Sequence, residues 1–127
     1  NGIIRLKNFS INTRDNLNFT PLMCASFSGS KEIVKKLLKM DKILINARSR
    51  NKKTALILAA TRGHMDIVKI LVKYGANTGL RQFQNSKKAC KPKTALDMSL
   101  LCNHKNITSY LKKKHTKKAG KYIYWKP

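Results

Sequence analysis

Few side chains in this sequence could carry out chemistry, and their spacing fits no common catalytic or metal-binding arrangement. The candidates are the acids, the cysteines and two histidines: Asp15, Glu32, Asp41, Asp66, Asp97, Cys24, Cys90, Cys102, His64 and His104. Cys90, Cys102 and His104 are potential Zn²⁺ ligands, but the Cys-x-x-Cys pairs typical of structural zinc sites are absent. No nucleophile, base and orienting group form a recognisable constellation. We therefore expect a non-enzyme with no cofactor, no metal and no small-molecule substrate.

Two of the acids match one another in position within an internal repeat of the sequence, and so do two of the histidines. Glu32 and Asp66 lie early in predicted helices, where a negative charge interacts favourably with the helix dipole. His64 and His104 each directly precede a predicted helix, and we expect each to cap that helix. These roles are structural, so attention moves to the helices themselves.

An internal repeat organises these helices. The segment TALILAATRGHMDIVKILVKYGAN, from Thr54, recurs upstream as TPLMCASFSGSKEIVKKLL, from Thr20, and downstream as TALDMSLLCNHKNITSYL, from Thr94. The starts lie 34 and then 40 residues apart. In the first two segments a short helix ends at Gly29 or Gly63, and a second follows with apolar residues at helical spacing. A period near 33 with two helices per unit predicts an all-α solenoid of about three repeats.

These segments resemble ankyrin repeats, a family whose members mostly bind other macromolecules. The resemblance covers residues 12–111 and implies a single repeat domain with β-hairpin fingers. The repeats are expected at about 15–48, 49–81 and 82–111. Residues 1–11 are interpreted as the end of a possible upstream repeat.

Several positions depart from the family pattern. In the fingers, Asn18 and Lys52 stand where the family usually has glycine, and lysine tolerates a positive φ poorly. In the third segment, Asn103 replaces the glycine after the first helix, while Thr108 and Lys112 replace apolar residues. A terminal repeat needs a polar outer face, because nothing stacks beyond it. We therefore expect the third repeat to be a C-terminal cap.

The resemblance implies that protein partners bind a concave face formed by the finger tips and first helices. Carried over position by position, the contacts are Asn16, Leu17, Phe19, Phe27, Ser28, Arg50, Asn51, Lys53, Thr61, Arg62 and Arg81. Phe19 and Phe27 would be aromatic anchors, and the basic residues would meet an acidic partner. The predicted function is a non-catalytic protein-interaction module that docks an acidic partner or serves as a subunit of a larger assembly.

Net charge is the outlier in the composition. Lysine and arginine number 28 against five aspartate and glutamate residues, giving +23. Such an excess favours an anionic partner, whether nucleic acid, acidic protein or membrane. An AT-rich coding sequence would also enrich Lys, Asn and Ile together, so compositional drift is a second explanation. A membrane is the least expected partner, because no amphipathic basic helix with an exposed apolar face is visible.

Two basic segments lie outside the repeat pattern: an insertion at 82–93 and an aromatic tail at 112–127. The insertion is either a tolerated surface loop or part of the binding edge. The tail could bind phosphates and stack on bases, act as a nuclear localisation signal, remain solvated, or fold back on the last helix. The candidate polyanion contacts are Lys87, Lys88, Lys91, Lys93, Lys112, Lys113, Lys114, Lys117, Lys118, Lys121, Tyr122, Tyr124 and Trp125. They support an alternative function, a structural RNA-contacting component of a ribonucleoprotein.

The three cysteines form no paired spacing. A disulfide framework is therefore not expected, and an intracellular reducing compartment fits better. No stretch approaches the roughly 18 apolar residues that a membrane-spanning helix requires.

Overall fold

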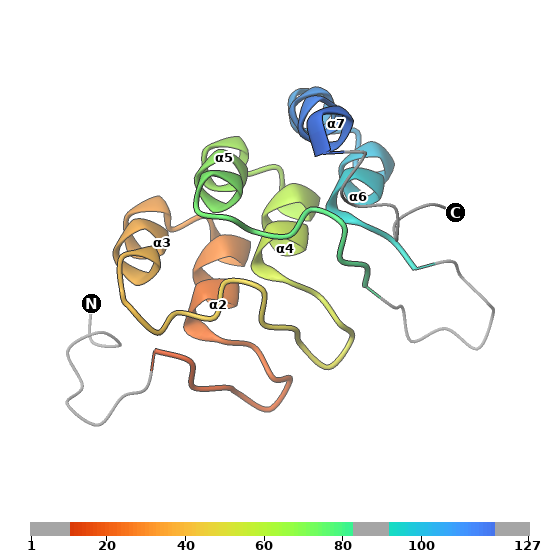
Figure 1. Cartoon of the computed structure of the whole chain (residues 1–127). Helices are drawn as coiled ribbons and strands as arrows, with labels where there is room; N and C mark the ends of the chain where they lie inside the picture. Colours follow the sequence, from red (N-terminus) through yellow and green to blue (C-terminus); the bar gives the residue numbers. More distant parts are fainter. Residues whose placement is uncertain (1–10, 83–91, 119–127) are drawn as a thin grey trace.

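A computed structural model describes residues 11–82 and 92–118, with the side chains of the last helix described through residue 114. The helices are α2 (Pro21–Ser28), α3 (Lys31–Leu38), α4 (Ala55–Arg62), α5 (Met65–Lys73), α6 (Ala95–Leu101) and α7 (Lys105–Lys118). They form three consecutive pairs that stack side by side (Figure 1). Helices α2, α4 and α6 make an inner layer, and α3, α5 and α7 make an outer layer. The predicted all-α solenoid is confirmed.

Each inner helix begins at a threonine. The hydroxyls of Thr20, Thr54 and Thr94 accept a hydrogen bond from the backbone N–H three residues further on. Each threonine thereby satisfies one of the amides that a helix leaves unpaired at its N-terminus. Asp97 completes a capping box by accepting the backbone N–H of Thr94 at 3.0 Å. The start of the third repeat is therefore held more tightly than those of the other two.

The core lies between the two layers. Outer helices contribute aliphatic residues at equivalent positions, and the inner helices contribute both large side chains, such as Leu22 and Leu56, and small ones. The buried set includes Val34, Leu37, Val68, Leu71, Ile107 and Leu111 from the outer layer, and Ala25, Ala59 and Ser99 from the inner layer. Repeats that bury a shared core depend on their neighbours for stability.

The fingers are turns that project from the inner layer (Figure 1). The backbone N–H of Asp15 donates to the carbonyl of Phe19, and that of Ser49 donates to Lys53. Within the described ranges the fingers contain no extended strand, and one isolated antiparallel bridge pairs Gln82 with Lys93. Asn18 and Lys52 adopt φ values of 62° and 63°, the conformation for which glycine is favoured.

The end of the third repeat differs from the polar cap expected from the sequence. Thr108 faces inward, where its hydroxyl lies 2.8 Å from that of Ser99 and donates to the carbonyl of His104. Leu100 and Leu101 are instead exposed, at 54% and 62%. Ala60, at the position equivalent to Leu100, is fully buried. The last repeat thus presents an apolar surface where the second repeat presents none.

Helix α7 is longer than the outer helices of the first two repeats. It continues through Lys118, so residues 112–118 of the predicted tail are helical. None of the described helices is both long enough and apolar enough to cross a lipid bilayer.

Candidate protein-interaction surface

Phe27 and Arg62 form the most distinctive contact on the inner face. They come from equivalent turns of α2 and α4, and the guanidinium carbon of Arg62 lies 4.7 Å from the centre of the Phe27 ring. A cation over an aromatic face is favourable by about 0.5–1 kcal/mol at exposed sites. The Phe27 side chain remains 43% exposed. Two sequence-predicted contact residues therefore combine into one apolar and positively charged surface.

The first two finger tips are joined to one another. Arg50 donates from its guanidinium to the carbonyl of Asn16 at 2.8 Å, and its backbone N–H donates to the carbonyl of Leu17 at 3.1 Å. These bonds position Leu17, whose side chain is 55% exposed beside the inner helices. The Arg50 guanidinium was predicted to contact a partner, and in the structure it also bonds the first finger to the second.

Other predicted contact residues mainly support the surface. The hydroxyls of Ser28 and Thr61 bond backbone carbonyls within their own helices, those of Cys24 and Ile57. Phe19 is half-buried and packs against the core, so only part of its ring is accessible to a partner. Asn51 and Lys53 are half-buried in the second finger.

An arginine ladder runs along the bases of the fingers. Arg14 donates to the carbonyl of Arg48 at 2.8 Å, and Arg48 donates to the carbonyl of Arg81 in the next repeat. Arg14 and Arg48 reach their partners across 34 and 33 residues. The sequence analysis placed Arg81 at the partner interface and gave Arg14 and Arg48 no function. The spacing of 34 residues between Arg14 and Arg48, which matches the repeat length, could have indicated their shared role.

The two histidines connect neighbouring repeats. His64 Nε2 lies 3.1 Å from the carbonyl oxygen of Phe27, and His104 Nε2 lies 3.0 Å from that of Thr61. The prediction that His64 caps its own helix is wrong, because its side chain makes no capping bond to α5. A capping imidazole would have to fold over its own helix, whereas these rings extend to the preceding inner helix.

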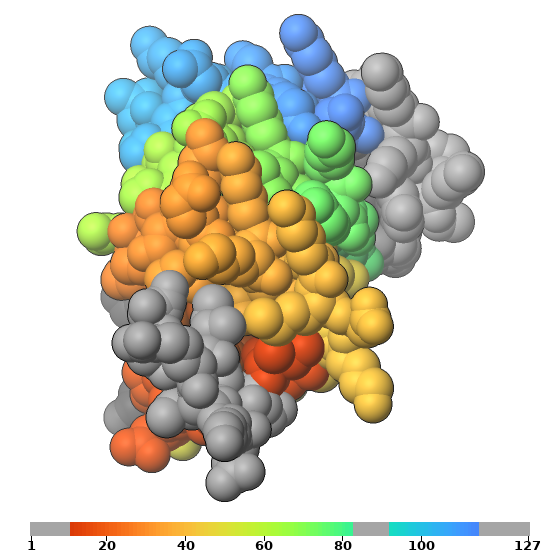
Figure 2. All heavy atoms as spheres, turned by 90° about the vertical axis from the view of Figure 1, so that its left-hand side faces the viewer, coloured from red at the N-terminus to blue at the C-terminus, as the bar shows by residue number. Residues whose placement is uncertain are grey.

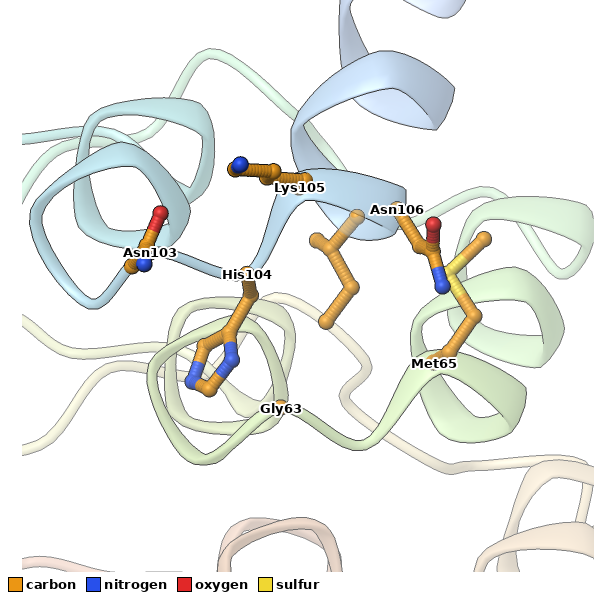
Figure 3. Close-up of a pocket in the computed structure, with 7 residues that line it drawn as sticks. Gly63, Met65, Asn103, His104, Lys105 and Asn106 are labelled. Atoms are coloured by element: carbon orange, nitrogen blue, oxygen red, sulfur yellow. The ribbon is translucent and has the colours of Figure 1, made fainter.

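Figure 3 shows the His104 ring turned toward Gly63. An open hollow of ≈ 390 Å³ lies beside this contact. Its lining comes from the N-terminal ends of α5 and α7 and the residues before them: Gly63, Met65, Asn103, His104, Lys105, Asn106 and Ile107. The hollow is therefore a feature of the junction between the second and third repeats.

The predicted polyanion contacts are only partly placed. Lys112, Lys113 and Lys114 lie on α7, with Lys114 Nζ 5.4 Å from the centre of the Tyr110 ring, and Lys93 lies at the bridge with Gln82. Lys117 and Lys118 belong to the helical backbone of α7, but their side chains lie outside the described part. The remaining candidates lie outside the described residues: Lys87, Lys88, Lys91, Lys121, Tyr122, Tyr124 and Trp125.

The potential metal ligands are dispersed. In the described part of the chain, no three His, Cys, Asp or Glu side chains come close enough to hold an ion. Cys24 and Cys102 are exposed free thiols, whereas Cys90 lies outside the described ranges. Burial by its surroundings raises the pKa of Cys24, and the nearby carboxylate of Asp15 raises it further.

Comparison with known protein families agrees with this geometry. The family profile described as "Ankyrin repeats (3 copies)" matches residues 41–121, and the profile described as "Ankyrin repeat" matches residues 17–50. No curated protein matches this chain. Together the two profiles cover residues 17–121, a range that contains all six described helices.

Proposed function

Because the chain belongs to the ankyrin-repeat family, whose repeats are generally non-catalytic protein-interaction modules, we propose that its concave face docks a protein with an acidic surface. We define the concave face by Leu17, Phe27, Arg50 and Arg62, on the finger tips and the inner helices. The observation that carries this proposal is the stacking of Arg62 on the exposed ring of Phe27.

The stacked pair has the two properties that protein interfaces favour. Phe27 offers apolar area at the junction of two repeats, and aromatic residues are enriched among energetically dominant contacts. Arg62 is held over the ring, so its N–H edges remain suited to a bidentate bond with a carboxylate. The +23 charge of the chain would speed its encounter with an acidic partner. The bond to Arg62 would fix the position of the partner on the concave face.

The test uses a peptide-display library selected against the full chain. We expect the recovered peptides to combine Asp or Glu with an apolar residue. Phe27→Ala and Arg62→Gln should each weaken the binding of these peptides about tenfold, which is 1.4 kcal/mol, while leaving the helical content unchanged.

Tyr74→Ala is the matched control, because Tyr74 is 44% exposed and lies at the end of α5 in the outer layer. It should leave the affinity unchanged. Peptides without acidic residues, or equal losses for the Phe27 and Tyr74 variants, would contradict the proposed concave site.

The RNA-contacting alternative draws on one described feature. Helix α7 carries Lys112, Lys113 and Lys114 beyond the predicted end of the repeat, and the first two are exposed. A reducing compartment is the expectation for either function, because the three cysteines form no paired spacing.

A further inference from the structure

The solvent side of the outer layer is rich in lysine. The described residues of α3, α5 and α7, together with the position after α3, include only two acids, Glu32 and Asp66. Lysines are far more numerous there. These are Lys31, Lys35, Lys36, Lys39, Lys69, Lys73, Lys105, Lys112, Lys113 and Lys114. Figure 2 shows side chains of the outer layer, in orange, green and blue, standing out one behind another in the upper half of the view.

Three of these lysines occupy the same place in successive repeats. Lys39, Lys73 and Lys113 each follow the opening threonine of their repeat by 19 positions, and all three are exposed. Because α3 contacts α5 and α5 contacts α7, the three lysines form a row across the outer layer. We call Lys39, Lys73 and Lys113 the lysine row. Neighbouring packed helices are about 8–10 Å apart, so the rungs of the row have roughly that spacing.

A structural explanation accounts for only part of the row. Lys39 and Lys73 lie at the C-terminal ends of α3 and α5, where a positive charge stabilises the helix dipole. Lys113 does not, because α7 continues to Lys118 and Lys113 lies inside the helix. The lysine is present in the third repeat although the helix end has moved, so the dipole does not explain the periodicity.

Three of the five acids make contacts away from the lysine row. Asp15 accepts backbone N–H bonds from Leu17 and Phe19, and Asp97 forms the capping box of α6. Asp66 lies 3.7 Å from Lys31, the single ion pair within the described ranges. No lysine of the row forms an ion pair within the described ranges.

The composition of the outer face discriminates among anionic partners. The described α3, α5 and α7 helices present no large exposed hydrophobic residue, and Tyr74 after α5 is the nearest one. Protein interfaces have an apolar centre, surface membrane helices insert apolar side chains, and single-stranded nucleic acids stack on aromatic rings. A row of charges with no apolar centre and a single exposed aromatic ring beside it, Tyr74, fits the phosphate backbone of a duplex, whose non-specific affinity comes almost entirely from charge neutralisation.

We propose that the outer face of the solenoid binds double-stranded nucleic acid through the lysine row, independently of sequence. The row lies in the opposite layer from Phe27 and Arg62, so this site does not depend on the proposed concave site. A rung spacing near 10 Å corresponds to the axial rise of about three phosphates of one strand.

The test measures binding of the full chain to a fluorescent DNA duplex over a salt series. The variant Lys39→Gln, Lys73→Gln, Lys113→Gln removes the row and keeps helix-compatible side chains. The slope of log K against log salt should become shallower by about 3, since each lost phosphate contact contributes about 0.9. Affinity at low salt should fall by more than about tenfold.

The control variant Lys52→Gln, Lys53→Gln, Lys93→Gln removes the same charge from the finger side. It should change the slope by less than about 1, and Phe27→Ala should leave duplex binding unchanged. Equal slope changes for the row and control variants would overturn the proposal, as would wild-type binding by the row variant. Binding to phosphatidylserine vesicles that requires the row, with duplex binding unaffected, would overturn it in favour of a membrane.

Discussion

The imidazole of His104 lies against Gly63 across the junction of the second and third repeats. A Cβ atom built on Gly63 would come within 2.7 Å of His104 Cε1, and His64 stands in the same relation to Gly29. Gly63 also has a φ of 79°, where a side chain is strained. Glycine is therefore favoured at position 63 for two reasons: the backbone has a positive φ, and the histidine of the next repeat leaves no room for a Cβ atom.

Gly63→Ala should lower the free energy of unfolding by about 2 kcal/mol, because a side chain at this φ costs about 1–2 kcal/mol and the Cβ displaces His104. Urea unfolding measures the loss. In the double variant with His104→Ala, the clash disappears, so the combined loss should be smaller than the sum of the single losses.

Asn103 provides the matched comparison for Gly63. It occupies the equivalent position with a φ of 60°, and no histidine of a further repeat lies against it in the described structure. Asn103→Gly should therefore change stability by less than about 0.5 kcal/mol. Additive losses for the Gly63 and His104 variants would show that the histidine imposes no requirement for glycine.

Ser26 carries a buried hydroxyl with no hydrogen-bond partner in the described structure. Ala60 stands at the equivalent position of the second repeat and is equally buried. An unpaired buried polar group costs about 1–3 kcal/mol. Ser26→Ala should therefore raise the free energy of unfolding by about 1 kcal/mol, measured as a higher urea midpoint with an unchanged slope. Ser28→Ala, which removes a bonded exposed hydroxyl, should give no such gain.

Cys24 should react slowly with alkylating reagents, because burial and the charge of Asp15 both raise its pKa. Only the thiolate reacts, and at a pH below the pKa a raised pKa leaves less of it. Asp15→Asn removes the charge but keeps an Oδ1 acceptor for Leu17 and Phe19. The pH profile of iodoacetamide reaction should then shift to lower pH.

This measurement uses a Cys90→Ser, Cys102→Ser background, so that Cys24 is the reacting thiol. The shift should be partial, since burial is the larger cause and remains in the variant. An unchanged profile would mean that the Asp15 carboxylate does not act on the thiol.

The sequence alone determined the helices and their pairing. Thr20 and Thr54 signal helix starts, Gly29 and Gly63 signal ends, and aliphatic residues at helical spacing identify the buried side of each outer helix. These signals are local, because capping and backbone conformation depend on residues within a few positions. The assignment of Phe27 and Arg62 to the inner face came from the resemblance to ankyrin repeats and not from these local signals.

The tertiary structure decided where the polar side chains go. His64 and Arg48 bond the backbone of neighbouring repeats, Thr108 turns into the core, and Leu101 remains exposed. The place of Thr108 depends on how α7 packs on α6 within one repeat, whereas the bonds of His64 and Arg48 depend on how closely one repeat stacks on the next. That distance is set by packing between residues more than 30 positions apart, so no local pattern contains it.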